Sequence, residues 1–220
     1  MVEKFTIYKN KYLSKNIKGY YNLYYTGYGK PYNPDFLNTL KNTYDSISFY
    51  DLEKAKNQVV EILLDSIPTI MTDNNLKSCT CICIPRSKAL TTYTERQLFF
   101  RDAVGITSYK LSDVLDGTDI IERHTNVFTT HFAKTKNPSR VAKIGLTTTK
   151  IDGNDGSMPY PGITKDTCYI DKNSVKGKDI ILIDDIYTLG VNVDEDGIQS
   201  LLDTGANNVI FYAIAYTRRG

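Results

Sequence analysis

The sequence has no excess of one charge and no long apolar run. Its 27 lysines and arginines nearly balance 25 aspartates and glutamates, and the formal net charge of +2 provides no global basic field for nucleic acid. No stretch approaches the roughly 20 apolar residues that a membrane-spanning helix needs, and the first residues lack an apolar run of signal-peptide length. We therefore expect a cytoplasmic protein with neither a membrane nor a nucleic-acid partner.

Cysteine and histidine are scarce, with four and two residues. Three of the cysteines alternate in residues 79–83 (CTCIC), so in a strand they would share one face. A zinc site usually needs CxxC spacing and further ligands, and only Cys168, His124 and His131 remain to supply them. We expect buried core thiols in a reducing compartment, and zinc binding is the alternative.

The length of 220 residues fits one domain with an extension. We place the extension at residues 1–77. Within it, residues 19–32 (GYYNLYYTGYGKPY) are rich in turn and strand formers, which predicts a short hairpin or ordered loop. Its tyrosines would pack on an interface or cover a core edge, and stacking on nucleobases is the alternative. Apolar residues at helical spacing predict helices at 35–44 and at 51–66, the second of which Pro68 would end.

Residues 78–220 change to alternating strands and helices, which predicts an α/β domain with a parallel sheet. An irregular segment, at about 117–165, interrupts the pattern, and so long a weakly patterned stretch is usually functional. The expected strands are 78–84, 180–184 and 208–216, and the expected helices are 92–104, opened by the capping-box spacing of Thr92 and Glu95, 110–115 and 194–203.

Two adjacent carboxylates mark the segment with the clearest chemistry. Residues 180–184 read as an apolar central strand that ends in Asp184, and Asp185 follows at once. Ligands of open α/β sheets bind beyond the carboxyl ends of such strands. Both acids cannot be core residues, because a buried unpaired carboxylate is strongly destabilising. They need a cation, a metal or hydroxyl donors, and the two hydroxyls of a ribose would satisfy them.

A turn and a helix follow the acid pair. Glycine in the turn permits a positive φ or a close approach to a ligand. The amides of the turn and of the helix N-terminus would converge on an anion, to which threonine and asparagine add side-chain donors. A phosphate beside a diol indicates a 5-phosphoribosyl group. The turn consists of Thr188, Leu189, Gly190, Val191 and Asn192.

Residues 181–192, ILIDDIYTLGVN, resemble the motif that binds 5-phosphoribosyl-1-pyrophosphate (PRPP) in type I phosphoribosyltransferases. In that family an apolar strand precedes two acids, two further residues and Thr-Thr-Gly-x-Thr. The resemblance implies that Asp184 and Asp185 hold the ribose hydroxyls and, directly or through water, Mg²⁺. Leu189 and Asn192 replace threonines of the motif. Thr188 stands where the hypoxanthine-guanine branch has an acidic base, so the competence-protein and amidophosphoribosyltransferase-like branch is nearer.

Two further segments correspond to parts of the family. Arg86, Ser87 and Lys88 follow the first strand of the domain, where the family has its pyrophosphate loop, and a solvated loop is the alternative. The irregular segment 117–165 corresponds to the mobile hood, whose cations would neutralise the leaving pyrophosphate. The candidates in the hood are Arg123, His124, His131, Lys134, Lys136 and Arg140.

The resemblance implies a Mg²⁺-dependent enzyme that transfers the 5-phosphoribosyl group from PRPP to a nitrogen acceptor and releases pyrophosphate. It also implies a phosphoribosyltransferase-like fold and a homodimer. Two alternatives remain open: a non-catalytic PRPP or nucleotide sensor, and an effector subunit that docks on a partner through its tyrosine-rich N-terminal region. The expected catalytic residues are Asp184, Asp185, Arg86, Lys88, Arg123 and His124.

Overall fold

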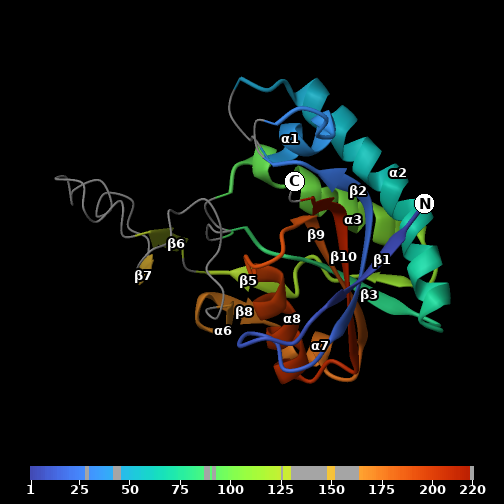
Figure 1. The fold of residues 1–220 in the computed structure, drawn as a ribbon, viewed down its shortest axis with the longest axis vertical. Helices are drawn as coiled ribbons and strands as arrows, with labels where there is room; N and C mark the ends of the chain where they lie inside the picture. The colour runs from blue at the N-terminus through green and yellow to red at the C-terminus, as the bar shows by residue number, and fades with distance from the viewer. Residues whose placement is uncertain are drawn as a thin grey trace.

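The fold is built on a mixed six-stranded sheet (Figure 1). The computed structural model describes residues 1–27, 30–41, 46–86, 90, 93–124, 126–129, 148–151 and 164–218, with strands 126–129 and 148–151 described by their backbone alone. All neighbouring strands of the sheet pair in parallel except the first two. The strand order is β1 (Glu3–Ile7), β2 (Ile17–Tyr25), β10 (Asn208–Thr217), β9 (Asp179–Tyr187), β3 (Cys79–Cys83) and β4 (Val114–Asp116). The expectation of an α/β fold with a parallel sheet is thus confirmed at this level.

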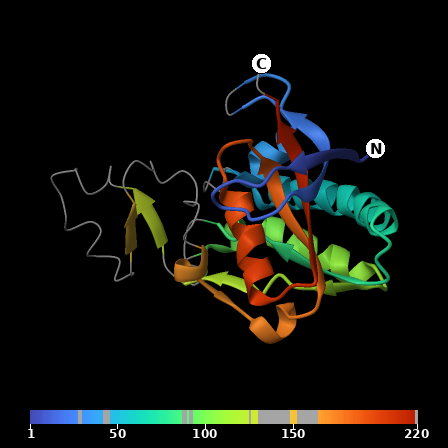
Figure 2. The same ribbon diagram turned by 60° about the horizontal axis from the view of Figure 1, so that its bottom comes forward.

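Helices cover both faces of the sheet, which explains why residues 180–183 of its central strand are apolar on both faces. Along β9, Ile181 and Ile183 face one core cluster, whereas Ile180 and Leu182 face the other. The first cluster packs under α1 (Asp35–Lys41), α2 (Phe49–Asp73) and α3 (Phe99–Lys110), and the second lies under α8 (Val193–Thr204) and α7 (Lys172–Val175). Figure 2 shows α2 and α8 on opposite sides of the strands.

The tyrosine-rich segment is a sheet strand as far as Tyr25, so the hairpin or loop expected at 19–32 is wrong for that part. Residues 26, 27 and 30–32 form a loop as expected, and residues 28 and 29 lie outside the described residues. Its β2 pairs in parallel with β10 and antiparallel with the upstream β1. Tyr20, Tyr21 and Tyr25 are buried, and the Tyr212 hydroxyl of β10 donates a 2.7 Å hydrogen bond to Asn22 of β2. The N-terminal 77 residues therefore contribute two strands to the same sheet as the acid pair.

Helix α2 passes through Pro68, where we expected it to end. A proline inside a helix removes one backbone hydrogen bond and costs about 3 kcal/mol. Ile67 and Ile70 are fully buried on either side of it, and full burial of each such side chain contributes roughly 1.5–3 kcal/mol. Burial therefore outweighs the proline, and the helix continues to Asp73.

The helix expected at 92–104 begins one turn later than predicted. The capping interaction joins Thr94 and Gln97, because the Thr94 amide donates to Gln97 Oε1 at 3.1 Å, and it opens a short 3₁₀ helix (Glu95–Gln97) before α3. The helix expected at 110–115 is wrong. Residues 110–116 instead end α3 and form β4, because Val114 pairs with Cys79 of β3 and its burial favours an edge strand.

Two small sheets flank the main one. β5 (Ile121–Arg123) pairs antiparallel with β8 (Cys168–Ile170), next to α6 (Thr164–Thr167). β6 (Asn126–Thr129) pairs with β7 (Thr148–Ile151). These strands occupy parts of the segment expected to form a hood. In the described part of the chain, no helix has the length and apolar character needed to cross a membrane.

Three of the predicted core thiols are where the alternation of residues 79–83 placed them. Cys79, Cys81 and Cys83 lie on the α1–α3 face of β3 and are buried. Burial raises the pKa of the Cys83 thiol, which keeps it protonated at neutral pH. Cys168 is also buried and free. Among the described residues no group of three or more His, Cys, Asp or Glu side chains is placed to hold a metal, so nothing there supports the zinc alternative.

Candidate functional site

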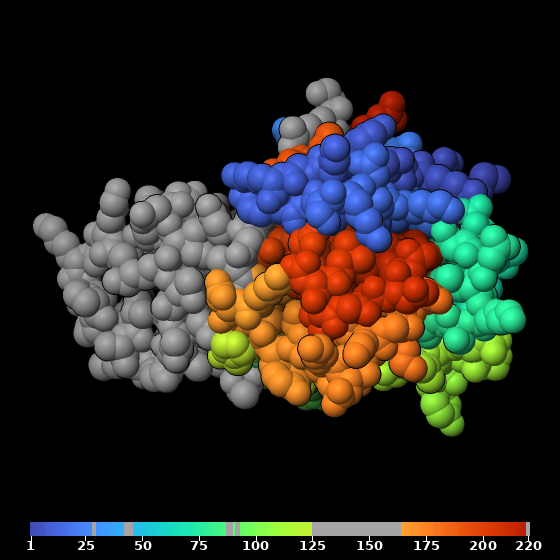
Figure 3. All heavy atoms as spheres, turned by 90° about the horizontal axis from the view of Figure 1, so that it is seen from below, coloured from blue at the N-terminus to red at the C-terminus, as the bar shows by residue number. Residues whose placement is uncertain are grey.

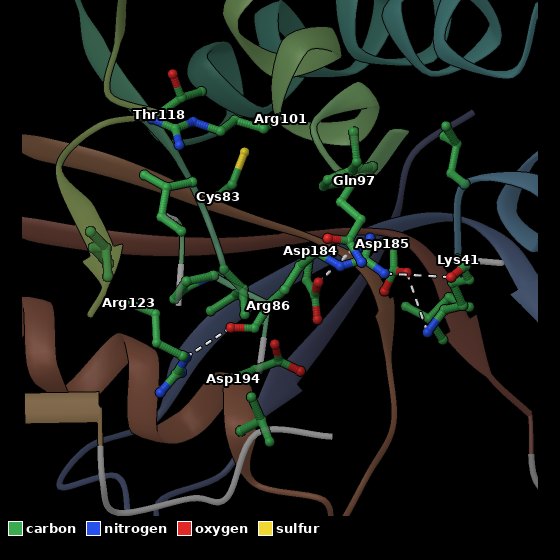
Figure 4. Close-up of a pocket in the computed structure, with 18 of the residues that line it drawn as sticks. Lys41, Cys83, Arg86, Gln97, Arg101, Thr118, Arg123, Asp184, Asp185 and Asp194 are labelled. Atoms are coloured by element: carbon green, nitrogen blue, oxygen red, sulfur yellow. Dashed lines mark hydrogen bonds and ion pairs between the residues drawn. The ribbon is translucent and has the colours of Figure 1, made fainter. Parts of the chain in front are cut away.

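A cavity of about 310 Å³ opens where β3 ends beside β9 (Figure 4). The two strands pair as far as Cys83 and Ile183, and the Ile84 amide then donates to Ile183 O at 2.9 Å. Beyond this point β3 turns away, whereas β9 continues beside β10 to Tyr187. β9 is therefore longer than the strand expected at 180–184. Its acid pair lies at the carboxyl edge of the sheet, where ligands of such sheets bind.

Asp184 and Asp185 line this cavity from opposite faces of β9. Successive side chains of a strand alternate, so Asp185 follows Ile183 toward the α1–α3 face and Asp184 follows Leu182 toward α8. Their partners agree with this alternation. Lys41, the last residue of α1, forms an ion pair with Asp185 at 3.2 Å, and Asp184 is hydrogen-bonded to Asp194 in the first turn of α8.

Burial and charge control the protonation of the acids on the α8 side. Burial and, to a smaller extent, the charge of Asp185 raise the pKa of Asp184 to about 7, against the lowering effect of Lys41. Burial and the neighbouring Asp184 also raise the pKa of Asp194 well above its usual range. Two carboxyl groups in hydrogen-bonding contact favour one shared proton. At neutral pH this side of the cavity therefore offers both an acceptor and a donor.

The first turn of α8 also contains two buried oxygens that lack protein partners. Among the described residues, Asp194 Oδ1 and Glu195 Oε2 are the buried side-chain atoms with no hydrogen bond. Glu195 Oε1 accepts from the Tyr187 hydroxyl at 3.0 Å, whereas Asp194 lines the cavity. Such atoms are costly and call for a donor. A ligand in the cavity could supply that donor to Asp194.

The basic wall of the cavity comes from three arginines. Arg86, in the segment expected to bind pyrophosphate, lines it together with Arg101 of α3 and Arg123 of β5. Arg123 is buried, and it donates through Nε to Arg86 O at 2.8 Å and through Nη1 to the Thr167 hydroxyl. It therefore fixes the backbone at Arg86 while its charge borders the cavity. Ser87 and Lys88 lie outside the described residues.

Of the other hood cations that the sequence suggested, only His124 lies within the described residues. Its backbone amide donates to Thr167 O at 2.9 Å, and its side chain is exposed. It is not among the described residues that line the cavity, which Arg123 does line. The remaining hood candidates, His131, Lys134, Lys136 and Arg140, lie outside the described residues.

The expected phosphate turn follows β9 directly. Gly190 has a φ of 86°, the left-handed conformation that glycine permits and for which it was singled out. Thr188 and Val191 line the cavity, and the Val191 amide donates to Thr188 O at 3.1 Å. Leu189 is exposed, and α8 begins at Val193, immediately after the turn. The turn thus places a helix N-terminus beside the acid pair.

Asn192 is held by the loop between β1 and β2. Its φ of 65° is unusual for a residue other than glycine. Its Nδ2 donates to Gly190 O at 2.9 Å, and its Oδ1 accepts from Asn10 Nδ2 at 2.9 Å. The Ser14 amide donates to Gln199 of α8 at 2.9 Å, and Figure 3 shows the blue N-terminal segment directly against the red C-terminal one. The N-terminal loop therefore stabilises the turn.

Asn10→Asp is expected to loosen the turn while the loop stays folded. The aspartate keeps the oxygen that accepts from the Tyr12 and Leu13 amides at 2.8 and 3.1 Å, but it loses the donor to Asn192. Loss of one such hydrogen bond costs about 1 kcal/mol, or roughly a fivefold loss of protection. Amide hydrogen exchange at Val191, whose amide donates to Thr188 O, measures this change. Asn16→Asp, which alters the same loop at the Lys9 amide, should leave the Val191 amide protected. Equal exchange of this amide in both variants would contradict the stabilisation of the turn by Asn10.

Sequence reasoning missed Lys41, Asp194 and Arg101 as cavity residues. Lys41 lies 144 positions before Asp185 on a separate helix, and no local pattern links the two. Asp194 begins the helix expected at 194–203, where an acidic residue is ordinary because it is stabilised by the helix N-terminus, so its type gave no signal. Alternation along β9 was a usable signal, because it predicts that consecutive carboxylates have different neighbours.

The donor set of the cavity fits a hard divalent cation only in part. Mg²⁺ commonly keeps several waters and binds one or two carboxylates together with substrate phosphates. Asp184 and Asp185 could supply such carboxylates. Comparison with protein-family models and with curated protein sequences finds no match for this chain.

Proposed function

We propose that this protein binds PRPP at the carboxyl edge of the sheet and transfers its 5-phosphoribosyl group to a nitrogen acceptor. The observation that carries the proposal is the joint lining of one cavity by the acid pair, the turn after β9 and Arg86. Arg86 lies about 100 residues before the acid pair and the turn, which form one continuous segment, and the resemblance relates both segments to parts of a PRPP site. PRPP needs groups that bind its ribose hydroxyls, its 5-phosphate and its pyrophosphate in the same cavity.

The charges of the cavity suit the parts of PRPP. The turn and the N-terminus of α8 would bind the 5-phosphate through backbone amides. Asp184 and Asp185 would accept hydrogen bonds from the ribose hydroxyls. Arg86 and Arg101 would lie beside the pyrophosphate, whose charge a guanidinium matches well. The type I phosphoribosyltransferase fold is part of this proposal.

In the proposed reaction the nitrogen lone pair attacks the anomeric carbon as the bond from that carbon to the pyrophosphate oxygen breaks. The carbon passes through a state with oxocarbenium character, which nearby carboxylates stabilise. Pyrophosphate leaves with the bonding electrons, and the arginines stabilise its charge. Magnesium, when bound by the acid pair and the pyrophosphate, would supply further neutralisation. The protein mainly positions the reactants, and it needs to form no covalent intermediate.

Isothermal titration of PRPP in the presence of Mg²⁺ tests the binding part of the proposal. We expect saturable binding with one site per chain, and pyrophosphate release when an ammonia or amine acceptor is added. Binding without release for any nitrogen acceptor would favour the non-catalytic sensor. A folded protein that binds no PRPP would overturn the proposal, and ribose 5-phosphate and inorganic pyrophosphate, titrated separately, would show which half of the site had been misassigned.

A further inference from the structure

The last residue of α1 contacts both halves of the cavity. Lys41 Nζ lies 3.2 Å from Asp185 Oδ2, and the backbone oxygen of Lys41 lies 3.5 Å from Arg86 Nη2. Figure 4 shows Lys41 directed toward Asp185 at the edge of the cavity, with Arg86 nearby. This N-terminal helix lies outside the part of the chain that suggested a nucleotide site, yet it joins the acid pair to the basic wall.

Packing fixes this position of Lys41. Leu37 and Leu40 of α1 are buried, at 0% and 4% exposure, in the cluster formed with α2 and the sheet. Leu40 also lines the cavity. The backbone of α1 is therefore anchored one residue before Lys41, and only the lysine side chain can move. That side chain is 39% exposed and remains accessible to a ligand in the cavity.

Among the described residues, Asp185 is the one that forms an ion pair with the Lys41 ammonium. An ammonium group has three N–H donors, and one of them is directed at Asp185. The remaining donors can serve phosphate or hydroxyl oxygens. The ammonium of Lys41 also neutralises one oxygen of Asp185. A bound divalent cation would neutralise that oxygen in the same way.

We propose that Lys41 is a built-in cation of the site, which neutralises Asp185, competes with divalent metals for it and binds the sugar phosphate directly. The contact with the sugar phosphate rests on the proposed function, whereas the competition with metals does not. The site would then hold a sugar phosphate without metal, and the divalent ion would be needed only for the pyrophosphate.

Manganese alone is the probe for the metal competition. The affinity of the wild-type protein for Mn²⁺ is compared with that of Lys41→Gln, Lys41→Arg and the control Lys54→Gln, which removes an exposed lysine of α2. Removal of one positive charge 3.2 Å from a carboxylate oxygen is worth about 1 kcal/mol at high dielectric. Lys41→Gln should therefore bind Mn²⁺ roughly fivefold more tightly, and the other two variants should match the wild type. Unchanged or weaker binding by Lys41→Gln would overturn the proposed competition.

Ribose 5-phosphate, titrated in the presence of EDTA, is the probe for direct binding. Loss of a charged hydrogen bond should weaken binding by Lys41→Gln about tenfold, and Lys41→Arg should retain most of the affinity. Equal affinity of Lys41→Gln and the wild type would overturn the direct contact. If wild-type protein binds no ribose 5-phosphate, the proposed function is at fault, and the manganese experiment still decides whether Lys41 competes for Asp185.

Discussion

Replacing both Asp184 and Asp185 with asparagine is expected to abolish measurable PRPP binding and leave the protein folded. Each carboxylate would accept a charge-assisted hydrogen bond from a ribose hydroxyl, and each such bond contributes roughly 1.5–3 kcal/mol. Loss of both should weaken binding by a factor of roughly a hundred or more. Isothermal titration at pH ~8 measures the change above the Asp184 pKa of about 7, where wild-type Asp184 is largely ionised.

The fold should survive this double substitution because the acids contribute little to packing. Asn and Asp have nearly the same shape, and neutral side chains remove the burial cost and the mutual repulsion that raise the pKa of Asp184, which offsets the loss of the ion pair between Lys41 and Asp185. The strand pairing of β9 with β10 involves backbone atoms alone. Thermal melting should therefore show no loss of stability, and weakened binding could then be assigned to the site.

Asp179→Asn is the matched control on the same strand. Asp179 begins β9 at the end opposite the cavity, and its Oδ1 accepts from Asn207 at 2.7 Å. This variant removes one negative charge from β9 without altering the cavity, so PRPP affinity should match the wild type. If the double variant bound PRPP as tightly as this control, the acid pair would not be the ribose site.

Strong local patterns predicted the central part of the fold. The apolar run before Asp184, the glycine at position 205 and the acidic start of α8 place a strand, a helix and their junctions close to their observed positions. Gly205 adopts a φ of 102° at the end of α8, as a helix C-cap requires. Each of these signals depends on residues within one element, so the sequence alone could reveal it.

Elements that depend on distant partners were less predictable. The segment around Tyr20 and Tyr21 is rich in both turn and strand formers when read locally, and it joins the main sheet because β10 offers it a hydrogen-bonding edge. Pro68 breaks an isolated helix, whereas in α2 the burial of Ile67 and Ile70 outweighs it. In both cases tertiary packing overrides local propensity.

The same distinction separates the two halves of the candidate site. Asp184, Asp185 and Gly190 belong to one continuous segment, and their spacing was sufficient to identify them. Lys41 and Asn10 reach the same region from the N-terminal third of the chain, through an ion pair and a hydrogen bond. Their contributions arise from the packing of β2 and α1, which no local spacing expresses.

Asp194→Asn is expected to stabilise the protein, most strongly at alkaline pH. Asp194 is buried, its Oδ1 has no partner in the described structure, and burial together with Asp184 raises its pKa well above the usual range. The folded protein thus binds a proton that the unfolded chain releases above its ordinary Asp pKa. As pH rises from that value toward the folded pKa, wild-type stability falls by up to about 1.4 kcal/mol per pH unit. Asparagine, which does not titrate, removes this loss.

The helix dipole opposes this effect but is smaller. A negative charge in the first turn of α8 gains roughly 0.3–1 kcal/mol from the helix N-terminus. Burial of an ionised carboxylate without full hydrogen bonding costs several times more. The gap between the melting temperatures of Asp194→Asn and the wild type should therefore widen from pH ~5 to pH ~8, by roughly 2–4 °C for each kcal/mol.

Asp196→Asn, two residues along the same helix, is the matched control with the opposite sign. Asp196 is also buried, but its Oδ2 accepts from the amide of Thr164 at 3.1 Å and from the hydroxyl of that residue. Neutralising it weakens charge-assisted hydrogen bonds and should lower stability by about 1 kcal/mol. A wild type that melts at the same temperature as Asp194→Asn throughout this pH range would show that the buried Asp194 carboxylate carries no net cost in stability. A gain in stability accompanied by weaker PRPP binding would instead show that the carboxylate is retained for the ligand, at the expense of stability.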